Sequence, residues 1–378
     1  MCLERLLSLR LASLAALAAC AVAQAQAQEI PIMSIQSVTG AAAFAGASYQ
    51  NGIRLAVDEA NRKGVLGSAR IKLIERDNAS DKGQAINLAN QAIDRERVVL
   101  SLGPSATSDS VGAAPVFNDK RTPMMSMASS DAIIAPGPWV FKFQQSATDI
   151  SPRMAKYVLE KTPVRKVAMV YDRGNEALIE YKNYFRDPFK AGGGTVVAEE
   201  AVVTSDTNFL PLVTKLKAMD LDAVYLATYS EQSANIILQL RQAGLPEKVR
   251  FIGTIALVTP RFLNIVGKAA EGTLAVSEFV NGMDRPLNKA FEAAYKARYN
   301  AEPDGWAATG YSSVQVALAA LRNAGANPDR QKVRDALMTV RDVPVVVGSG
   351  SWNHSDRRPR YGSVVLVVKD GKFVQADR

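Results

Sequence analysis

The side chains that could carry catalytic or metal chemistry are scarce in this chain of 378 residues. It has one histidine, His354, and two cysteines, Cys2 and Cys20. A Ser–His–Asp triad needs a positioned histidine base, and no Gly-x-Ser-x-Gly turn surrounds any serine. One histidine and two cysteines also fall short of the ligands that a structural zinc site needs. We therefore expect no enzyme, no metal and no cofactor, and we interpret His354 as a surface turn residue.

Patterns that bind phosphates or nucleic acids are also missing. The chain has no Gly-x-x-x-x-Gly-Lys-[Ser/Thr] loop, and the stretch Gly40–Gly46 lacks the Gly-x-Gly-x-x-Gly spacing of dinucleotide-binding turns. The 45 lysines and arginines outnumber the 37 acidic residues, which gives a net charge of +8, but they are scattered. The densest run, Arg357–Arg360, has no interleaved aromatic residues and is interpreted as a solvated loop. We expect no nucleic-acid partner.

Hydroxyl-bearing and small residues do gather where predicted strands end. They occupy Ser34–Gly40, Gly103–Ser108 and the run Ala128, Ser129 and Ser130. In open α/β sheets, ligands bind at the carboxyl ends of the strands. Serine and threonine hydroxyls there, with the backbone N–H groups of a helix that follows the Gly103-Pro104 turn, would suit an anion such as a carboxylate. The alternative is that these side chains serve only as helix caps.

An alternation of strand-like and helix-like segments positions these residues. Short apolar runs alternate with segments in which apolar residues recur at helical spacing, as at residues 53, 56, 57 and 60. The alternation indicates parallel sheets that are covered by helices on both faces. The pattern restarts after residue 145, and the predicted strands lie at residues 30–36, 70–75, 98–102, 124–127, 164–171, 195–203, 223–227 and 251–255.

The final third of the chain does not form an α/β unit of its own. These segments must pack back onto the earlier units, so the chain crosses between the units more than once. We expect two Rossmann-like α/β lobes joined by a multi-segment hinge, with residues 28–146 and 275–345 in the first lobe and 147–274 and 346–378 in the second. The segments are a strand at 274–279, helices at 287–299, 305–324 and 330–338, and a terminal hairpin that turns at Asp370-Gly371.

Residues 1–25 are interpreted as a secretory signal peptide. Arg5 and Arg10 precede an uncharged apolar run at residues 11–23, and Ala-x-Ala sequences follow. The run falls short of the ~20 residues that a membrane-spanning helix needs. An alternative is lipid attachment at Cys20, because Leu17-Ala18-Ala19-Cys20 resembles a bacterial lipobox, but we favour cleavage at the Ala-x-Ala sites. Either route leaves no cysteine in the mature chain, which suits an oxidising compartment such as the periplasm.

Several short motifs occur in a specific order along the mature chain. They are residues 37–46 (SVTGAAAFAG), 51–61 (NGIRLAVDEAN), 77–81 (DNASD), 102–108 (LGPSATS), 241–245 (RQAGL), 270–274 (AEGTL) and 291–299 (FEAAYKARY). Together they resemble the leucine/isoleucine/valine-binding protein family, the type I periplasmic solute-binding proteins of ABC transporters. Each motif is short, but the shared order covers essentially the whole mature chain.

The resemblance implies two lobes with a ligand in the cleft between them, and it assigns roles by position. Thr107 matches the hydroxyl that holds a ligand carboxylate. Ala128 and Ser130 match a loop whose backbone carbonyl and hydroxyl contact the head group of an amino acid. Phe44 matches an aromatic residue after the first strand, and Tyr229 matches one that lines the second lobe.

Two positions depart from the family pattern. Family members that bind amino acids carry an acidic residue, which pairs with the ligand ammonium, where this chain has Ile255. The family's Tyr-Gly pair is replaced by Glu176-Ala177. Burying an ammonium group without a counter-charge costs several kcal/mol. Either Glu176 or Glu231 therefore supplies the negative charge, or the ligand has no ammonium group.

The resemblance leads to an expected function. We expect an exported, monomeric solute-binding protein that closes around a branched-chain amino acid or a related small carboxylate and delivers it to an ABC transporter permease. An aromatic or keto acid that lacks an ammonium group is the alternative ligand. A sensory component that binds a ligand without transporting it would use the same fold.

Overall fold

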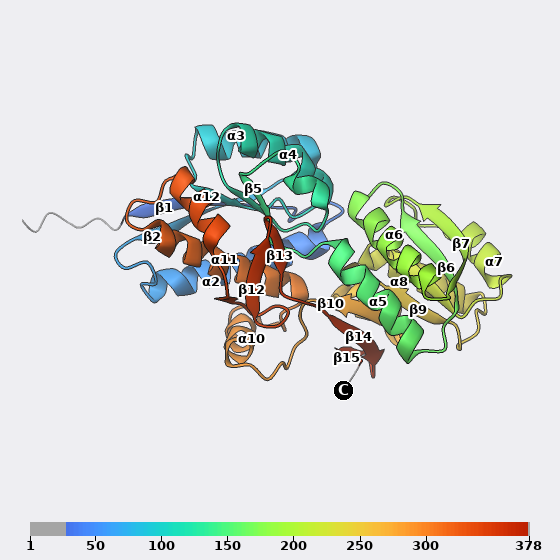
Figure 1. The fold of residues 1–378 in the computed structure, drawn as a ribbon. Coiled ribbons are helices and arrows are strands. Elements are labelled where there is room, and N and C mark those ends of the chain that lie inside the picture. The colour runs from blue at the N-terminus through green and yellow to red at the C-terminus, as the bar shows by residue number, and fades with distance from the viewer. Residues whose placement is uncertain (1–27, 377–378) are drawn as a thin grey trace, which may run out of the picture.

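The computed structural model describes residues 28–376, which form two α/β lobes (Figure 1). The expected signal peptide and Cys20 lie outside the described residues. The first lobe is built on a parallel sheet in the order β2-β1-β3-β4-β5. Its strands are β1 (Glu29–Gln36), β2 (Arg70–Asp77), β3 (Leu100–Leu102), β4 (Met124–Ser126) and β5 (Val140–Lys142).

Alternate side chains of β1 are buried on opposite faces of this sheet. Ile30 and Ile32 belong to one apolar core, whereas Met33 and Ile35 belong to another. This two-sided burial explains why the strand is almost continuously apolar in sequence. The helices of the lobe are α2 (Ala43–Arg62), α3 (Lys82–Asp94), α4 (Thr107–Asp119), α10 (Pro286–Tyr299), α11 (Gly305–Ala324) and α12 (Arg330–Thr339).

Two glycines allow α11 to pack closely against α2. A Cβ on Gly52 would lie 2.0 Å from the Ala307 carbonyl oxygen, and a Cβ on Gly310 would lie 2.3 Å from the Tyr49 carbonyl oxygen. Only a residue without a Cβ fits at either position. This approach brings Tyr49 of α2 and Trp306 of α11 together, with ring centroids 5.4 Å apart. A segment from the final third of the chain thereby contributes to the same surface as a segment from its start.

The second lobe is built on a sheet in the order β15-β14-β10-β9-β8-β6-β7. The strands from β10 to β7 are parallel, and the hairpin β14–β15 pairs with β10 in the antiparallel sense. The strands are β6 (Lys166–Asp172), β7 (Thr195–Val202), β8 (Ala223–Ala227), β9 (Arg250–Gly253), β10 (Leu274–Ser277), β14 (Val364–Lys369) and β15 (Lys372–Gln375). The helices are α5 (Ala147–Lys161), α6 (Glu176–Ala191), α7 (Leu210–Lys217), α8 (Ser230–Gln242) and α9 (Pro260–Val266).

The prediction of two α/β lobes joined by several crossings is confirmed. The sequence reasoning missed α5, β5, α9 and a small sheet of β11 (Val343–Pro344), β12 (Ser351–Ser355) and β13 (Arg358–Arg360). All of these except α5, which has 15 residues, are too short to show a periodic pattern. Sheet membership also differs from the expected lobe boundaries at two segments. β10 belongs to the second sheet, and β12 and β13 lie beside β5 of the first lobe, where the Lys142 N–H donates to the Arg357 carbonyl.

The interpretation of His354 as a surface turn residue was wrong. His354 lies in β12 and is 6% exposed. Its ring packs at a tilt on Trp352 and edge-on to Phe141, and its Nε2 lies 2.8 Å from a guanidinium nitrogen of Arg341. Burial, with the Arg341 charge as a second cause, lowers the pKa of His354 below its usual value. The residue is therefore a neutral part of the core.

The interpretation of Arg357–Arg360 as a solvated loop was also wrong. Arg357 donates to the carbonyls of Ile134, Gly137 and Val140, which satisfies the backbone ahead of β5. The next residues form β13, where arginine side chains pair with aspartates. The basic run has a structural role because its guanidinium groups satisfy buried carbonyls and carboxylates, a function that charge patterning cannot reveal.

Three segments connect the lobes: residues 143–146, 278–285 and 361–363. Gln145, in the first segment, ties all three together. Its Nε2 donates to Glu278 Oε1 at 3.3 Å and to the Gly362 carbonyl at 2.9 Å, and its Oε1 accepts from the Gly362 N–H at 3.0 Å. The backbone N–H of Gln145 also donates to Glu278 Oε1 at 3.2 Å. This hydrogen-bonded crossing is the hinge of the molecule.

Glu278 is the carboxyl group at the hinge and is 2% exposed. Burial raises the pKa of Glu278 to about 7, against the opposing effects of hydrogen bonds from Tyr361 and Gln145 and of the charge on Lys142. An unfolded glutamate titrates near ~4.3, so the folded protein binds the proton more tightly than the unfolded chain does. The stability from this group is fully present below that lower pKa and is lost as the pH rises through about 7.

We predict that raising the pH from 5 to 8 lowers the free energy of unfolding by about 2–3 kcal/mol through Glu278. The variant Glu278→Gln should reduce this dependence, because an amide keeps the shape and the acceptor oxygen of the protonated acid but does not ionise. Denaturant unfolding of both proteins at both pH values measures the difference. Equal pH slopes in the two proteins would show that another group titrates.

Candidate ligand-binding site

A cavity of about 70 Å³ lies between the lobes, which is several times the volume that one water molecule needs. The first lobe contributes Phe44, Tyr49, Thr107, Ala128, Gln144 and Trp306 to its wall. The second lobe contributes Asn175, Ala177, Tyr181, Tyr229 and Ile255. None of the lining residues, all of which lie within residues 28–376, carries a charge.

The connection from β3 to α4 presents hydrogen-bond donors to this cavity. The first helical bond of α4 is donated by Ser110 to Ala106, so the N–H groups of Thr107 and Ser108 precede the bonded ladder. Neighbouring hydroxyls already have partners, since Ser105 accepts from the Ser37 N–H at 3.0 Å and Ser110 donates to the Pro104 carbonyl at 3.0 Å. The Thr107 hydroxyl and these N–H groups are therefore the donors that a ligand can use.

A buried lysine holds the loop that follows β4. The Lys142 ammonium donates to the Ser129 carbonyl, to Asp131 Oδ1 at 2.7 Å and to Ser146 Oγ at 2.7 Å. Burial lowers the pKa of Lys142, and the charge on Asp131 opposes that shift. With three acceptors arranged around it, the ammonium fixes the position of Ser129 and, with it, one side of the cavity.

Three helices begin at the cavity without a side-chain cap. Their N-cap residues are Ala42 for α2, Ala106 for α4 and Tyr229 for α8, and all three line the cavity. In contrast, α3, α11 and α12 are capped by aspartate side chains. An uncapped N-terminus has a partial positive charge and N–H groups without an intrahelical partner. At α2, Ala43 and Ala45 donate to the Gly40 and Ala42 carbonyls, so α4 and α8 supply most of the free N–H groups. The backbone of both lobes therefore makes the cavity favourable for an anion.

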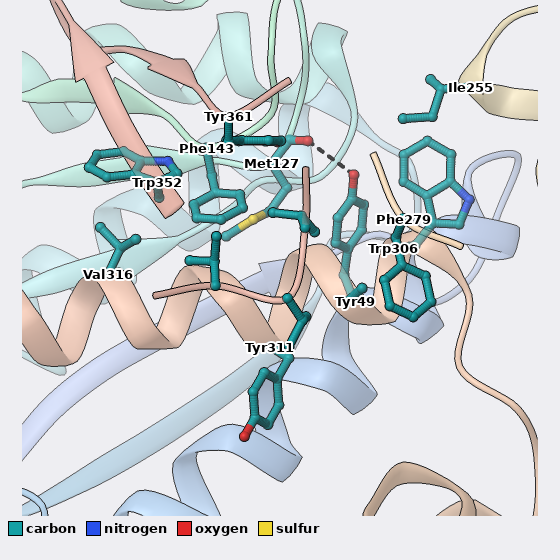
Figure 2. Close-up of a cluster of buried hydrophobic side chains, with 14 of the residues drawn as sticks. Tyr49, Met127, Phe143, Ile255, Phe279, Trp306, Tyr311, Val316, Trp352 and Tyr361 are labelled. Carbon is teal, nitrogen blue, oxygen red and sulfur yellow. Dashed lines mark hydrogen bonds between the residues drawn. The ribbon is translucent and has the colours of Figure 1, made fainter. Parts of the chain in front are cut away.

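Aromatic rings form the rest of the wall. Phe44 of the first lobe lies 5.1 Å from Tyr229 of the second, centroid to centroid, and 6.1 Å from Trp306. Figure 2 shows Trp306 close to Tyr49 and Ile255, and it shows the Tyr49 hydroxyl donating to the Met127 carbonyl at 3.1 Å. The Tyr229 hydroxyl accepts from Asn175 at 2.7 Å. The wall is apolar and closes across the two lobes.

Most of the residues predicted from sequence come together at this cavity. Phe44, Thr107, Ala128, Ser129, Tyr229 and Ile255 line it. Two do not. Glu176 is exposed at the start of α6, and the hydroxyl of Ser130 donates to Glu180 of α6 at 2.6 Å, which links the lobes beside the cavity.

The sequence reasoning missed Tyr49, Gln144, Tyr181 and Trp306. Gln144 follows β5, a strand too short to be predicted, and Tyr181 lies inside α6 rather than after a strand. Trp306 begins a helix whose bounds were predicted, but nothing in the sequence shows that α11 packs against α2. A search for aromatic residues in the first turn of each predicted helix would have found Trp306.

A cavity between two hinged α/β lobes, with uncapped helix N-termini and aromatic rings around it, defines a two-lobed protein that binds a small molecule. Within the described residues, no group of histidine, cysteine or acidic side chains could hold a metal ion, and no helix has the length and apolar character to cross a membrane. The chain belongs to the periplasmic binding protein family, whose model matches residues 29–372.

Individual relatives support this assignment. The chain is 27% identical over 333 residues to the Leu/Ile/Val-binding protein of Escherichia coli K12, and the aligned region covers 87% of this chain and 88% of that protein. It is 26% identical to a leucine-binding protein from Thermotoga maritima, with a TM-score of 0.85 over 92% of this chain and 97% of that one. A solute-binding protein from Rhodopseudomonas palustris in complex with benzoate shares the fold, at 20% identity and a TM-score of 0.83 over 92% and 95% of the two chains. The relatives are solute-binding proteins rather than enzymes.

We predict that Lys142→Met lowers the free energy of unfolding by about 2–4 kcal/mol, because it leaves Asp131 and the Ser129 carbonyl without their shared donor. Chemical unfolding of the two proteins measures the loss. Lys166→Met is the matched control, since Lys166 also pairs with an aspartate, Asp220, but at the exposed surface, and this variant should unfold like the wild type. Similar losses in both variants would contradict the role given to Lys142.

Proposed function

We propose that this protein is the solute-binding component of an ABC importer and that its ligand is a small carboxylic acid without an ammonium group, such as an aromatic or keto acid. The observation that supports the proposal is a cavity between the lobes that no charged side chain lines and at which three helices begin without a side-chain cap. These N–H groups and the Thr107 hydroxyl would hold the ligand carboxylate. Closing of the lobes would then enclose the rest of the ligand among the aromatic rings.

Within residues 28–376, no acidic side chain lines the cavity. Ile255 stands where amino-acid-binding members of the family are expected to carry an acid, and Ile255 lines the cavity. Glu176 is exposed outside the cavity, and Glu231 pairs with Arg261 at 2.5 Å. An enclosed ammonium would therefore lose its hydration without gaining a counter-charge, which costs several kcal/mol.

A branched-chain amino acid is the second candidate ligand. The names of the relatives in Escherichia coli and Thermotoga maritima support it, as do the apolar side chains of Ile255 and Leu178 at the cavity. Aliphatic keto acids would fill the same apolar volume without requiring a carboxylate partner. The two ligand classes therefore differ in one group, the ammonium.

The proposal includes export and delivery. Residues 1–25 would direct the chain to the periplasm, where it would act as a monomer and pass its ligand to a permease of the inner membrane. The relatives named as binding proteins support this location and role.

We predict that small carboxylic acids raise the melting temperature of the purified protein, because a ligand that binds only the folded state stabilises it. A thermal-shift screen should include benzoate, phenylacetate, 3-phenylpropanoate and the 2-oxo acids that correspond to leucine, isoleucine and valine. The matching amino acids serve as controls. Shifts with the amino acids and none with the acids would overturn the proposed ligand class.

The variant Thr107→Val should weaken binding of the acid by about 10- to 100-fold, since it removes one hydrogen bond to a charged group and keeps the shape of the side chain. Thr107→Ser keeps the hydroxyl and should bind within a few-fold of the wild type. Isothermal titration calorimetry measures both affinities. Unchanged affinity in Thr107→Val would show that the carboxylate binds elsewhere.

A further inference from the structure

Two buried donors at the far end of the cavity have no hydrogen-bond partner within the described chain. They are Nε2 of Gln144 and the hydroxyl of Tyr181. Gln144 is 4% exposed and Tyr181 is 2% exposed, and both line the cavity. A buried donor without a partner is unfavourable for the folded protein. Gln144 lies in the connecting segment 143–146 that follows β5, whereas Tyr181 lies in α6 of the second lobe.

The sheet of the first lobe separates Gln144 from Thr107. β3, which leads to Thr107, and β5, which leads to Gln144, are separated by β4. Neighbouring strands are about 4.8 Å apart, so the two ends of the site are separated by roughly 10 Å. A ligand of one aromatic ring with a carboxylate and a substituent at the far side of the ring is long enough to reach both ends.

The loop after β4 lies beside one of the two donors, Tyr181. Ser129, held by Lys142, lies near the Tyr181 hydroxyl, although no hydrogen bond of ordinary geometry joins them. Burial raises the pKa of Tyr181 well above its usual value, the charges of Glu278 and Glu180 raise it further, and the Ser129 side chain lowers it. The phenol therefore stays protonated and acts as a donor at neutral pH.

We infer that Gln144 and Tyr181 form a second polar subsite, which accepts a neutral oxygen of the ligand, such as a hydroxyl or a carbonyl, at the end opposite its carboxylate. The inference rests on the proposed function, because it places the carboxylate at Thr107. One neutral oxygen has two lone pairs and accepts from both donors. Because Gln144 lies in a connecting segment and Tyr181 in the second lobe, the same oxygen would also link the second lobe to the hinge.

The test compares acids that differ only in the far oxygen. Calorimetric titration of the wild type with benzoate and 4-hydroxybenzoate, and with phenylacetate and 4-hydroxyphenylacetate, measures the preference. We expect the hydroxylated acid of at least one pair to bind about 10- to 100-fold more tightly. Equal affinities within both pairs would overturn the inference and leave the proposed function intact. Binding of amino acids with no binding of any of the four acids would overturn the proposed function as well.

The variant Tyr181→Phe tests whether the Tyr181 hydroxyl forms a hydrogen bond with the far oxygen of the ligand. It should lose most of the preference for the hydroxylated acid while binding the unsubstituted acid as the wild type does. Tyr225→Phe is the matched control, because Tyr225 is also buried and donates to the Tyr181 carbonyl but does not line the cavity. It should keep the preference. The melting temperature of Tyr181→Phe should stay within a few degrees of the wild type, which shows that the variant is folded. If this folded variant binds both acids of a pair more weakly by the same factor, Tyr181 does not form the hydrogen bond with the far oxygen.

Discussion

A charge enclosed between the two lobes loses its water, and protein groups must replace that hydration. Lys142 meets this constraint with an aspartate, a carbonyl and a hydroxyl around its ammonium. Glu278 meets it by holding its proton more tightly, since burial raises its pKa to about 7. Among the described residues, no charged side chain lines the cavity between the lobes. Its backbone N–H groups and neutral donors would replace the hydration of the anion that we propose as its ligand.

The need to replace the hydration of an enclosed charge also couples ligand binding to closure of the lobes. The hinge is already tied by Gln145, and few contacts cross the cleft beside the cavity, among them the Phe44–Tyr229 ring pair and the 2.6 Å hydrogen bond from Ser130 to Glu180. A ligand that contacts both lobes adds to these contacts only when the lobes are closed. It therefore shifts the population toward the closed form by the difference in its affinity for the two forms.

Much of the architecture followed from local patterns. The βα alternation predicted both lobes, and the bounds of α11 were predicted as residues 305–324, because long amphipathic or strongly apolar segments leave a clear signal. Six of the eight predicted site residues line the cavity, since strand ends and a family resemblance point to the same sheet edge.

Gln144, Tyr181 and Trp306 were not predictable in this way. Their place depends on the packing of α11 on α2 and on how the lobes close, which are long-range contacts. His354 and Arg357 were misinterpreted for the same reason, because their partners are distant in sequence.

The central claim is that the cavity accepts a carboxylate and rejects an ammonium group. Isothermal titration calorimetry of the wild-type protein with 3-phenylpropanoate and phenylalanine, and with 4-methyl-2-oxopentanoate and leucine, tests it most directly. We predict that at least one of the two acids binds and that its amino-acid counterpart binds at least 100-fold more weakly, which corresponds to about 3 kcal/mol for an unpaired buried ammonium. Tighter binding of either amino acid than of its matched acid would contradict the account.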